Sequence, residues 1–565
     1  MIPEALRERL PRAFDALRGY DPARFSRDLL AGVTVGLVAL PLSMAFAISS
    51  GVSPQSGIYT AVVAGFLISA LGGSRVQIGG PTGAFVVVVY GIVATHGLDG
   101  LYMCTLMAGV MLLLMGWTGM GVAVRFIPRP VVVGFTNGIA LLIASTQIKD
   151  FFGLRIEHVS AVFHTRMIQL VEGAGSFSFP TTLLAVVALS VVLLTRRLVP
   201  RVPGAVVALL LATVAATLLR LPVETIGTRF GGIPAGLPPL QFPHFRPEMI
   251  QPLLAPAITV AMLGAIESLM SATVADRMIG DRHNPNVELV AQGIANIVSP
   301  LCGGLPATGA IARTATNIRS GAQTPVAGIV HALTLLAVLL FAAPLVVHVP
   351  LAVLSAILLV VAWNMGVWEE IPELLRLSKT DISVWLVTFA LTVFADLTVA
   401  VEAGMILAAL LFIRKVAVTT TVSEVTDEDV EAGRIHVLQD KIIPEYAAVF
   451  RIHGPFLFGS AEKLTEISER MAELPPIVLL RLRNMTAIDA TGLNAIEDLA
   501  DRLHRSGRTL IVCGARRQPA ELMARAEFGQ HIGRENVCAS ITEALERARV
   551  VHEAADRVSA ARPGE

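Results

Sequence analysis

The sequence predicts an all-α polytopic membrane domain followed by a small cytoplasmic α/β domain. Of the 565 residues, 54% are hydrophobic and 16% are charged, whereas soluble domains carry about 25% charged residues. None of the 46 residues from 29 to 74 is charged. After Arg414 the composition becomes that of a soluble protein. We therefore expect most of the surface of the first part to lie in lipid.

The charge-free stretches set the number of membrane segments. Residues 29–74 are about twice as long as one spanning helix, which needs about 20 residues, and Gly51 to Pro54 mark the turn between two such helices. The further charge-free windows cover residues 76–98, 100–124, 130–148, 174–195, 202–219, 250–266, 289–312, 320–368 and 382–395. With a last segment after Glu402, we predict about 14 segments.

Basic residues predict the orientation of these segments. The arm at residues 1–28 carries six Arg without an apolar run, so we expect no cleavable signal peptide. With 14 segments, this arm shares one side with the pairs Arg125/Arg129, Arg196/Arg197, Arg277/Arg282, Arg376/Lys379 and Arg414/Lys415. The positive-inside rule then predicts a multi-pass protein of the inner (plasma) membrane with both termini in the cytoplasm.

The chain divides into five predicted parts. They are a cytoplasmic N-terminal arm (1–28), a transmembrane domain (29–417, with repeats at about 29–221 and 250–417), an acidic linker (418–446), an α/β domain (447–555) and a tail (556–565). In the α/β domain we expect strands at 447–453, 477–483 and 509–513, and helices near 460–473, 491–506 and 541–554.

Several classes of protein are excluded by what the sequence lacks. The 44 basic and 44 acidic residues balance, so no global field favours nucleic acid. The four cysteines are far apart and lack metal-ligand spacing. There is no nucleophile-elbow motif, Walker sequence or pair of catalytic carboxylates. We therefore expect no enzyme, no cofactor and no metal site, and membrane lipid is the partner that the apolar composition predicts.

A near-repeat locates the predicted site. The Gly/Pro cluster at residues 79–85 recurs at residues 303–311, and Thr82 and Thr308 are 226 positions apart. This offset predicts two halves of about seven spans each. Because an odd number of spans turns the second half upside down, we predict a seven-plus-seven inverted repeat of the kind found in transporters.

Both copies of the cluster open a helical stretch that is too short to cross. Residues 82–96 would cover roughly 22 Å and residues 310–320 roughly 16 Å, against a hydrocarbon core of about 30 Å. We predict two half-helices whose N-termini face each other near the midplane. Their unpaired N–H groups and dipoles would then form a site for a small anion. The alternative is that the clusters are ordinary Gly-rich packing kinks.

Glu267 is the clearest ionisable residue inside a spanning segment. Such residues are paired, protonated or functional, and we interpret Glu267 as the carrier of a coupling proton. Ser271 follows at i+4 on the same helix face and would share a bound cation, water or substrate. Alternatively, Glu267 forms an ion pair with Arg313 that ties two helices together. If it does not pair with Glu267, Arg313 either adds positive electrostatic potential to the anion site or caps the cytoplasmic end of its helix.

At this point the sequence resembles a known family. Residues 28–85 resemble the first part of the SulP family of anion transporters. Two later segments resemble the eighth and tenth spans of that family, namely GAIESLMSATVADRM and ATGAIARTATNIRSGAQTP. The C-terminal domain resembles the STAS domain that these proteins carry. The resemblance covers essentially the whole chain. It implies a 14-segment inverted repeat, an elevator mechanism and a homodimer.

The resemblance also assigns residues. It implies an anion site formed by Thr82, Gly83, Ala84 and Phe85 together with Gly309, Ala310, Ile311, Ala312 and Arg313, and it puts Glu267 at the coupling position. Members that use sodium tend to have Asp and Thr where this chain has Glu267 and Ser271, so it favours protons. Many members place Gln after the first-span Pro, whereas Leu42 follows Pro41 here.

The STAS domain and the substrate leave alternatives open. Thr491 follows Asp489 in the stretch that carries a phosphorylatable Ser in other STAS domains, so it is a candidate phosphorylation site. Alternatively, Thr491 only caps its helix. We expect secondary uptake of sulfate, bicarbonate or a C4-dicarboxylate by proton symport. There are three competing hypotheses. The protein is an uncoupled channel or exchanger that uses the same site, a nucleobase transporter, or a membrane tether for a cytoplasmic partner of the STAS domain.

Overall fold

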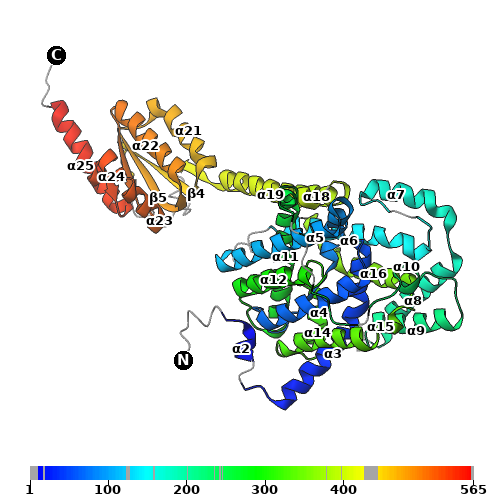
Figure 1. The fold of residues 1–565 in the computed structure, drawn as a ribbon. Coiled ribbons are helices and arrows are strands. Elements are labelled where there is room, and N and C mark those ends of the chain that lie inside the picture. Colours follow the sequence, from blue (N-terminus) through cyan, green and yellow to red (C-terminus); the bar gives the residue numbers. More distant parts are fainter. Residues whose placement is uncertain are drawn as a thin grey trace. The chain divides into compact units, whose positions relative to one another are not determined.

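The computed structural model describes residues 10–16, 19–121, 128–156, 159–199, 202–234, 236–240, 244, 246–376, 378–395, 397–425 and 443–560. It divides into two compact units, residues 1–406 and 407–565, with the boundary inside helix α19 (Leu397–Thr419). Figure 1 shows a helical unit and a smaller unit built around a sheet. The predicted all-α membrane domain with a small α/β domain is confirmed. Most of the predicted linker, residues 426–442, lies outside the described residues.

The first unit consists of helices. Seven described helices are long and apolar enough to cross a membrane, and two more, α9 and α14, are apolar but shorter. The 14-segment inverted repeat stays a prediction. The longer helices are α3 (Pro22–Ser49), α4 (Pro54–Leu71), α5 (Val86–Trp117), α6 (Arg129–Phe152), α8 (Phe179–Leu198), α9 (Gly204–Leu218), α11 (Ile250–Ile279), α12 (Pro285–Leu301), α14 (Val326–Phe341), α16 (Leu351–Met365) and α18 (Lys379–Phe394). The shorter ones are α2 (Arg12–Ala16), α7 (Phe163–Glu172), α10 (Ile226–Phe230), α13 (Ile311–Arg319), α15 (Ala343–Val346) and α17 (Glu370–Leu374).

Gly and Pro set several helix boundaries, as the sequence predicts. Helix α3 ends at Ser49 and α4 starts at Pro54, so the predicted turn is present. In α5, Gly97 has φ 70° and ψ −170°. This left-handed geometry favours glycine and interrupts the helix immediately after His96, where we predict the first half-helix to end.

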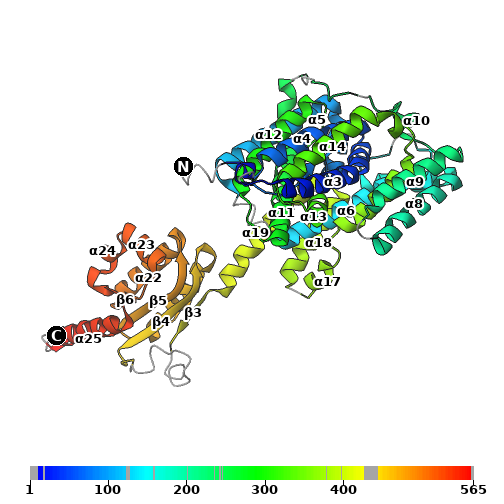
Figure 2. The same cartoon turned by 90° about the horizontal axis from the view of Figure 1, so that it is seen from below.

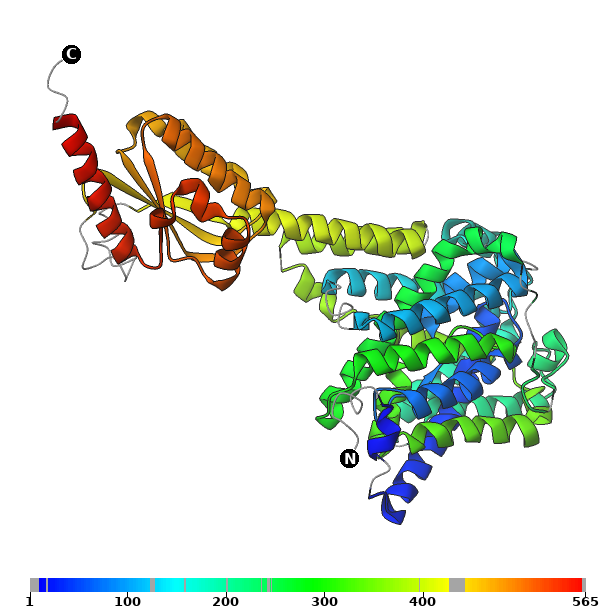
Figure 3. The same ribbon diagram turned by 60° about the vertical axis from the view of Figure 1, so that its left-hand side comes forward.

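The helices of the first unit form two groups. Helices α3, α4, α5, α11, α12, α13 and α14 pack mainly against one another, and we call them the core group. Helices α6, α8, α9, α16 and α18 likewise pack mainly against one another, and we call them the second group. Figure 3 shows the long helices of the core group lying side by side. The candidate site lies between the two groups.

The second unit is a five-stranded sheet with helices on both faces. The strand order is β3 (Thr421–Glu424), β4 (Ala447–Phe456), β5 (Ile477–Ile488), β6 (Thr509–Cys513) and β7 (Val537–Cys538), parallel except for the antiparallel β3–β4 pair. Helices α22 (Ala490–Arg505), α23 (Arg517–Arg525) and α24 (Phe528–Ile532) cover one face and α25 (Ile541–Ala560) covers the other (Figure 2). The three predicted strands are present.

Two expectations for this unit need correction. The predicted linker is wrong at its start, because residues 421–424 pair with β4 and close the edge of the sheet. The predicted helix at 460–473 is divided into the 3-10 turn η5 (Phe458–Leu464), the short helix α21 (Thr465–Glu469) and the 3-10 turn η6 (Met471–Glu473). Helices α23 and α24 were not predicted, since a nine-residue and a five-residue helix show little periodicity.

Candidate functional site

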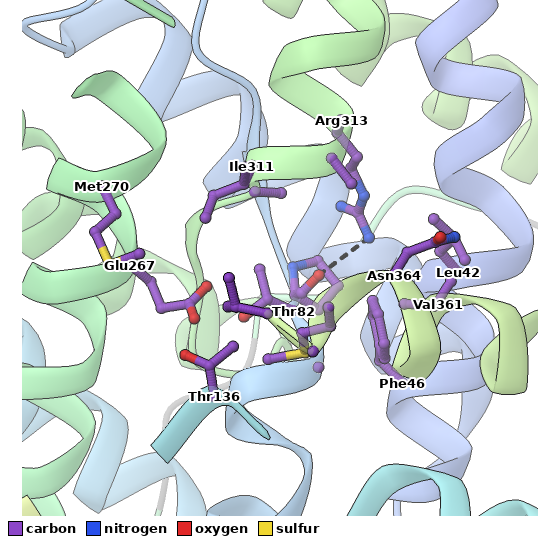
Figure 4. Close-up of a pocket in the computed structure, with 17 residues that line it drawn as sticks. Leu42, Phe46, Thr82, Thr136, Glu267, Met270, Ile311, Arg313, Val361 and Asn364 are labelled. Atoms are coloured by element: carbon purple, nitrogen blue, oxygen red, sulfur yellow. Dashed lines mark hydrogen bonds between the residues drawn. The ribbon is translucent and has the colours of Figure 1, made fainter. Parts of the chain in front are cut away.

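A cavity of about 400 Å³ lies where the two predicted half-helices begin. On one wall are Thr82 and Gly83, which precede α5, and residues 310–313 at the start of α13. The opposite wall comes from the second group, with Thr136 on α6 and Asn364 on α16. Figure 4 shows the labelled side chains converging on this space from both groups. We call it the central cavity.

Both Gly/Pro clusters are extended where a continuous helix would otherwise run. Strand β1 (Gly79–Gly80) pairs antiparallel with β2 (Thr308–Gly309), and Gly79 lies opposite Gly309. The Ala310 N–H continues the pairing by donating to the Ile78 carbonyl at 2.8 Å. This pairing brings the starts of the 3-10 turn η1 (Gly83–Phe85) and of α13 to the same place. The two helix interruptions are therefore joined to each other.

Side chains of neighbouring helices satisfy the backbone that β1 and β2 leave unpaired. Asn296 of α12 accepts from the Ala307 N–H and donates to its carbonyl, both at 2.8 Å. Thr314 of α13 accepts from the Ile78 N–H at 3.0 Å, and the Ser268 hydroxyl of α11 accepts from the Gly309 N–H at 3.1 Å. Non-helical backbone at membrane depth is tolerated only where protein buries it or it lines a water-filled cavity, and these contacts supply that condition.

Thr82 offers a free hydroxyl to the cavity. It precedes η1 with an extended backbone, and its side chain makes no capping hydrogen bond. The residue is 8% exposed, and its Oγ1 has no partner within the described chain. A buried hydroxyl without a partner costs free energy, and an anion in the cavity would accept from it.

Arg313 places a positive charge at one side of the cavity. It is 2% exposed, and one Nη donates to the Pro81 carbonyl at 3.0 Å and to the Ser43 hydroxyl at 3.4 Å. Its other Nη has no partner within the described chain. A guanidinium satisfied by neutral acceptors keeps its charge available to an anion.

Glu267 lies across the cavity from Arg313, as Figure 4 shows. Its carboxylate faces the central space and forms no hydrogen bond or ion pair with any residue that the structure describes. The expected alternative, an ion pair with Arg313, is therefore not present. Glu267 and Arg313 are the two charged residues among the described lining.

Four predicted site residues do not line the cavity. Ala84 and Phe85 are buried in the hydrophobic core, because the 3-10 turn directs them away from the space. Gly309 lies within β2. Ser271 lies one turn beyond Glu267 and is fully buried against α13, where its hydroxyl contacts that of Thr314 at 3.1 Å. The structure thus puts Ser271 in the packing between helices rather than beside Glu267.

Sequence reasoning missed most of the opposite wall. Thr136, Val361, Asn364 and Met365 line the cavity from the second group, and Met270 of α11 was also missed, although it lies on the core-group side. These residues lie in ordinary apolar helices without a repeated motif, so no local signal identified them. Leu42, which stands where the resembled family often has Gln, also lines the cavity, from α3 of the core group.

The described residues hold no group of three or more His, Cys, Asp or Glu side chains that could bind a metal ion. The polar groups that line the central cavity are the hydroxyls of Thr82 and Thr136, the amide of Asn364, one guanidinium and one carboxylate.

In the STAS-like unit, Thr491 is exposed in the first turn of α22. The N-cap is Asp489, whose carboxylate accepts from the Gly492 N–H at 2.8 Å and from the Phe458 N–H at 3.1 Å. The alternative that Thr491 caps this helix is thus wrong. Its role as a phosphorylation site stays a prediction.

Comparisons with known proteins identify the family. The profile of the Sulfate permease family matches residues 25–388, and that of the STAS domain matches residues 439–544. The chain belongs to the sulfate permease family of anion transporters. It is therefore a multi-pass membrane transporter and not an enzyme.

Relatives of this permease share nearly its full length. The Putative sulfate transporter YvdB of Bacillus subtilis is 43% identical, covering 92% of this chain and 97% of the relative. The Bicarbonate transporter BicA of Synechocystis is 30% identical over 94% and 96%.

Two solved structures support the fold of the permease. The transmembrane domain of a cyanobacterium bicarbonate transporter BicA matches with a TM-score of 0.60 at 32% identity, covering 69% of this chain and 98% of that one. The murine Slc26a9 anion transporter matches with a TM-score of 0.85 over 97% and 95% of the two chains. At 18% identity, the latter likeness concerns the fold alone.

Proposed function

We propose that this permease is a secondary active transporter that carries a small oxyanion together with a proton through the central cavity. The supporting observation is the unpaired carboxylate of Glu267, which faces the same space as the Thr82 hydroxyl and Arg313. The substrate is sulfate, bicarbonate or a C4-dicarboxylate. Relatives named as sulfate and bicarbonate transporters support the first two.

The charges of the cavity give a physical reason for coupling. With Glu267 ionised, its negative charge cancels that of Arg313 and opposes an incoming anion. Protonation removes that opposition and leaves Arg313, the Thr82 hydroxyl and the helix starts at η1 and α13 to bind the anion. Proton and anion therefore favour each other's binding, which is what symport requires. Sodium lacks this support, because Ser271 does not reach the cavity.

The two helix groups provide a route for movement. The half-helix starts, Glu267 and Arg313 belong to the core group, whereas Thr136 and Asn364 belong to the second group. Sliding of the core group against the second group would carry the bound anion across the membrane as an elevator. A homodimer held in the inner membrane, with both termini in the cytoplasm, would provide a fixed frame for this movement.

Uptake into liposomes tests the proposal. Purified protein is challenged with labelled sulfate, bicarbonate, fumarate and chloride, with and without an inward proton gradient. We expect the gradient to accelerate uptake of the transported oxyanion, and Glu267→Gln to abolish that acceleration. Glu402→Gln is the matched control, since Glu402 is exposed on α19 and does not line the cavity. Wild-type flux that ignores the gradient would instead favour an uncoupled channel or exchanger.

A further inference from the structure

A second large cavity lies within the second helix group. It has a volume of about 970 Å³ and is lined by the end of α6, the segment 153–156, the start of α8, and Arg229 of α10, among others. We call it the distal cavity. None of the residues predicted as site residues lines it.

The two cavities contact the same two helices at different levels. In α6, Thr136 lines the central cavity and Lys149 lines the distal one, a separation of about 20 Å along the helix axis. In α16, Val361 lines the central cavity and Leu351 the distal one, about 15 Å apart. Under the predicted orientation, the distal cavity is on the outer side of the membrane.

Positive charge in the distal cavity is only partly compensated. Arg229 forms an ion pair with Asp150 at 2.8 Å and another with Glu224, so these two carboxylates compensate its positive charge. Lys149 and Arg155 also line the cavity, and within the described chain their side chains form neither a hydrogen bond nor a salt bridge. Arg155 is exposed, and Lys149 is attracted by Asp150 and Glu224 without contact at salt-bridge distance. With three cations and two carboxylates, the described charged lining has an excess of one positive charge.

Two further features favour a small anion here. Helix α8 starts at Phe179 on the cavity wall with no side-chain cap from Ser178, so the positive end of its dipole faces the same space. The lining also includes Ser176, Ser178 and Thr181, whose hydroxyl groups do not suit an apolar ligand. A concave, positively charged surface raises the local concentration of anions and their rate of arrival.

We propose that the distal cavity is a second anion site, in which Lys149 and Arg155 collect small free oxyanions before they reach the central cavity. The choice of the transported oxyanion as the ligand rests on the proposed function. The positive potential at Lys149 and Arg155 does not, so it is tested by a measurement that needs no transport.

A cysteine reporter measures that potential. The four native cysteines are replaced by Ser, and Phe179→Cys provides a thiol on the cavity wall in vesicles of phosphatidylcholine. Its labelling rates are compared for a negatively charged sulfonate and a positively charged trimethylammonium methanethiosulfonate. We expect the anionic reagent to be favoured about fivefold over its preference at Val171→Cys. Val171 is 76% exposed on α7 and does not line the cavity, so it provides the reference.

Charge variants connect the preference to the two residues. Lys149→Gln with Arg155→Gln should reduce the preference to the reference value, whereas Lys149→Arg should retain it. Sulfate should slow labelling at Phe179→Cys relative to gluconate at equal ionic strength. An unchanged preference in the double variant, or no protection by sulfate, would overturn the proposal. Protection by added phosphatidylglycerol but not by sulfate would assign the site to a lipid headgroup and also overturn it.

Transport then separates the two proposals. In the Glu267→Gln variant the labelling preference should persist even if coupled uptake is lost. In a transport-competent protein, the Lys149→Gln and Arg155→Gln pair should raise KM for the external oxyanion severalfold and leave kcat unchanged. A fall in kcat with unchanged KM would contradict a collecting role.

Discussion

Gly309→Ala is expected to damage the central cavity mainly through a clash with Gln77, with a lesser close approach of 3.2 Å to the Ser268 Cα. A Cβ at Gly309 would lie 1.6 Å from Nε2 of Gln77, whereas ordinary contact begins at 3.4 Å. The amide would therefore have to retreat by about 1.8 Å, the difference between those distances. The φ of Gly309 is not in the left-handed region, so this clash, rather than backbone strain, determines the effect.

The cost follows from what Gln77 would lose. Gln77 is 4% exposed, and Nε2 donates to the Ser268 carbonyl at 3.0 Å. Breaking a buried hydrogen bond and leaving its groups unsatisfied costs about 1–3 kcal/mol. We expect the free energy of unfolding to fall by that amount. We also expect anion uptake to fall, because Gly309 directly precedes the start of the second half-helix.

Thermal or denaturant unfolding in detergent and uptake into liposomes measure the two effects. Gly91→Ala is the matched control, since a Cβ there meets no atom within 4 Å. Adding Gln77→Ala to Gly309→Ala should remove most of the clash and leave only the 3.2 Å approach to the Ser268 Cα, so that the double variant is close in stability to Gln77→Ala alone. Simple addition of the two single effects, or wild-type stability of Gly309→Ala, would refute the assigned contact.

Three further outcomes follow from other contacts. Asn296→Ala should lower the free energy of unfolding by about 2–4 kcal/mol, because both backbone groups of Ala307 lose their partner; denaturant titration checks this, and a loss below 0.5 kcal/mol would contradict it. Thr82→Val should raise KM for the anion about 3–10-fold, because the hydroxyl that would donate to the anion is removed. The free energy of unfolding should not change, since that hydroxyl has no partner within the described chain. An unchanged KM in liposome uptake would count against an anion contact at Thr82. Burial raises the pKa of the Cys513 thiol to about 12, so at pH 8 it stays protonated and should resist alkylation until denaturant is added. Cys538, which is partly exposed, should react first in mass-spectrometric mapping, and equal rates would contradict the assignment.

The sequence predicts one wall of the candidate site better than the other. Residues near Thr82 and Arg313 are recognisable because each lies in or just after a Gly/Pro cluster, and such clusters indicate a helix interruption from the local sequence alone. Thr136 and Asn364 leave no such trace, since a polar residue in an apolar helix reveals nothing about what lies opposite.

Helix geometry explains the remaining differences. Ser271 shares a helix face with Glu267, but a step of four residues moves about 6 Å along the axis, which is enough to leave the cavity and enter the contact with Thr314. In the second unit, β3 was not predicted because it lies in a segment whose acidic composition indicated a linker. Its four residues are held by pairing with β4, and such pairing cannot be inferred from so short a run.

The pairing of β1 with β2 has a consequence for biosynthesis. Gly79 and Gly309 lie 230 positions apart, so the first strand enters the bilayer long before its partner has been translated. During that interval its N–H and C=O groups need other hydrogen-bond partners, because exposure of unpaired backbone to lipid costs several kcal/mol per group. We therefore expect a nascent chain truncated between the two strands to remain with the insertion machinery or to be degraded.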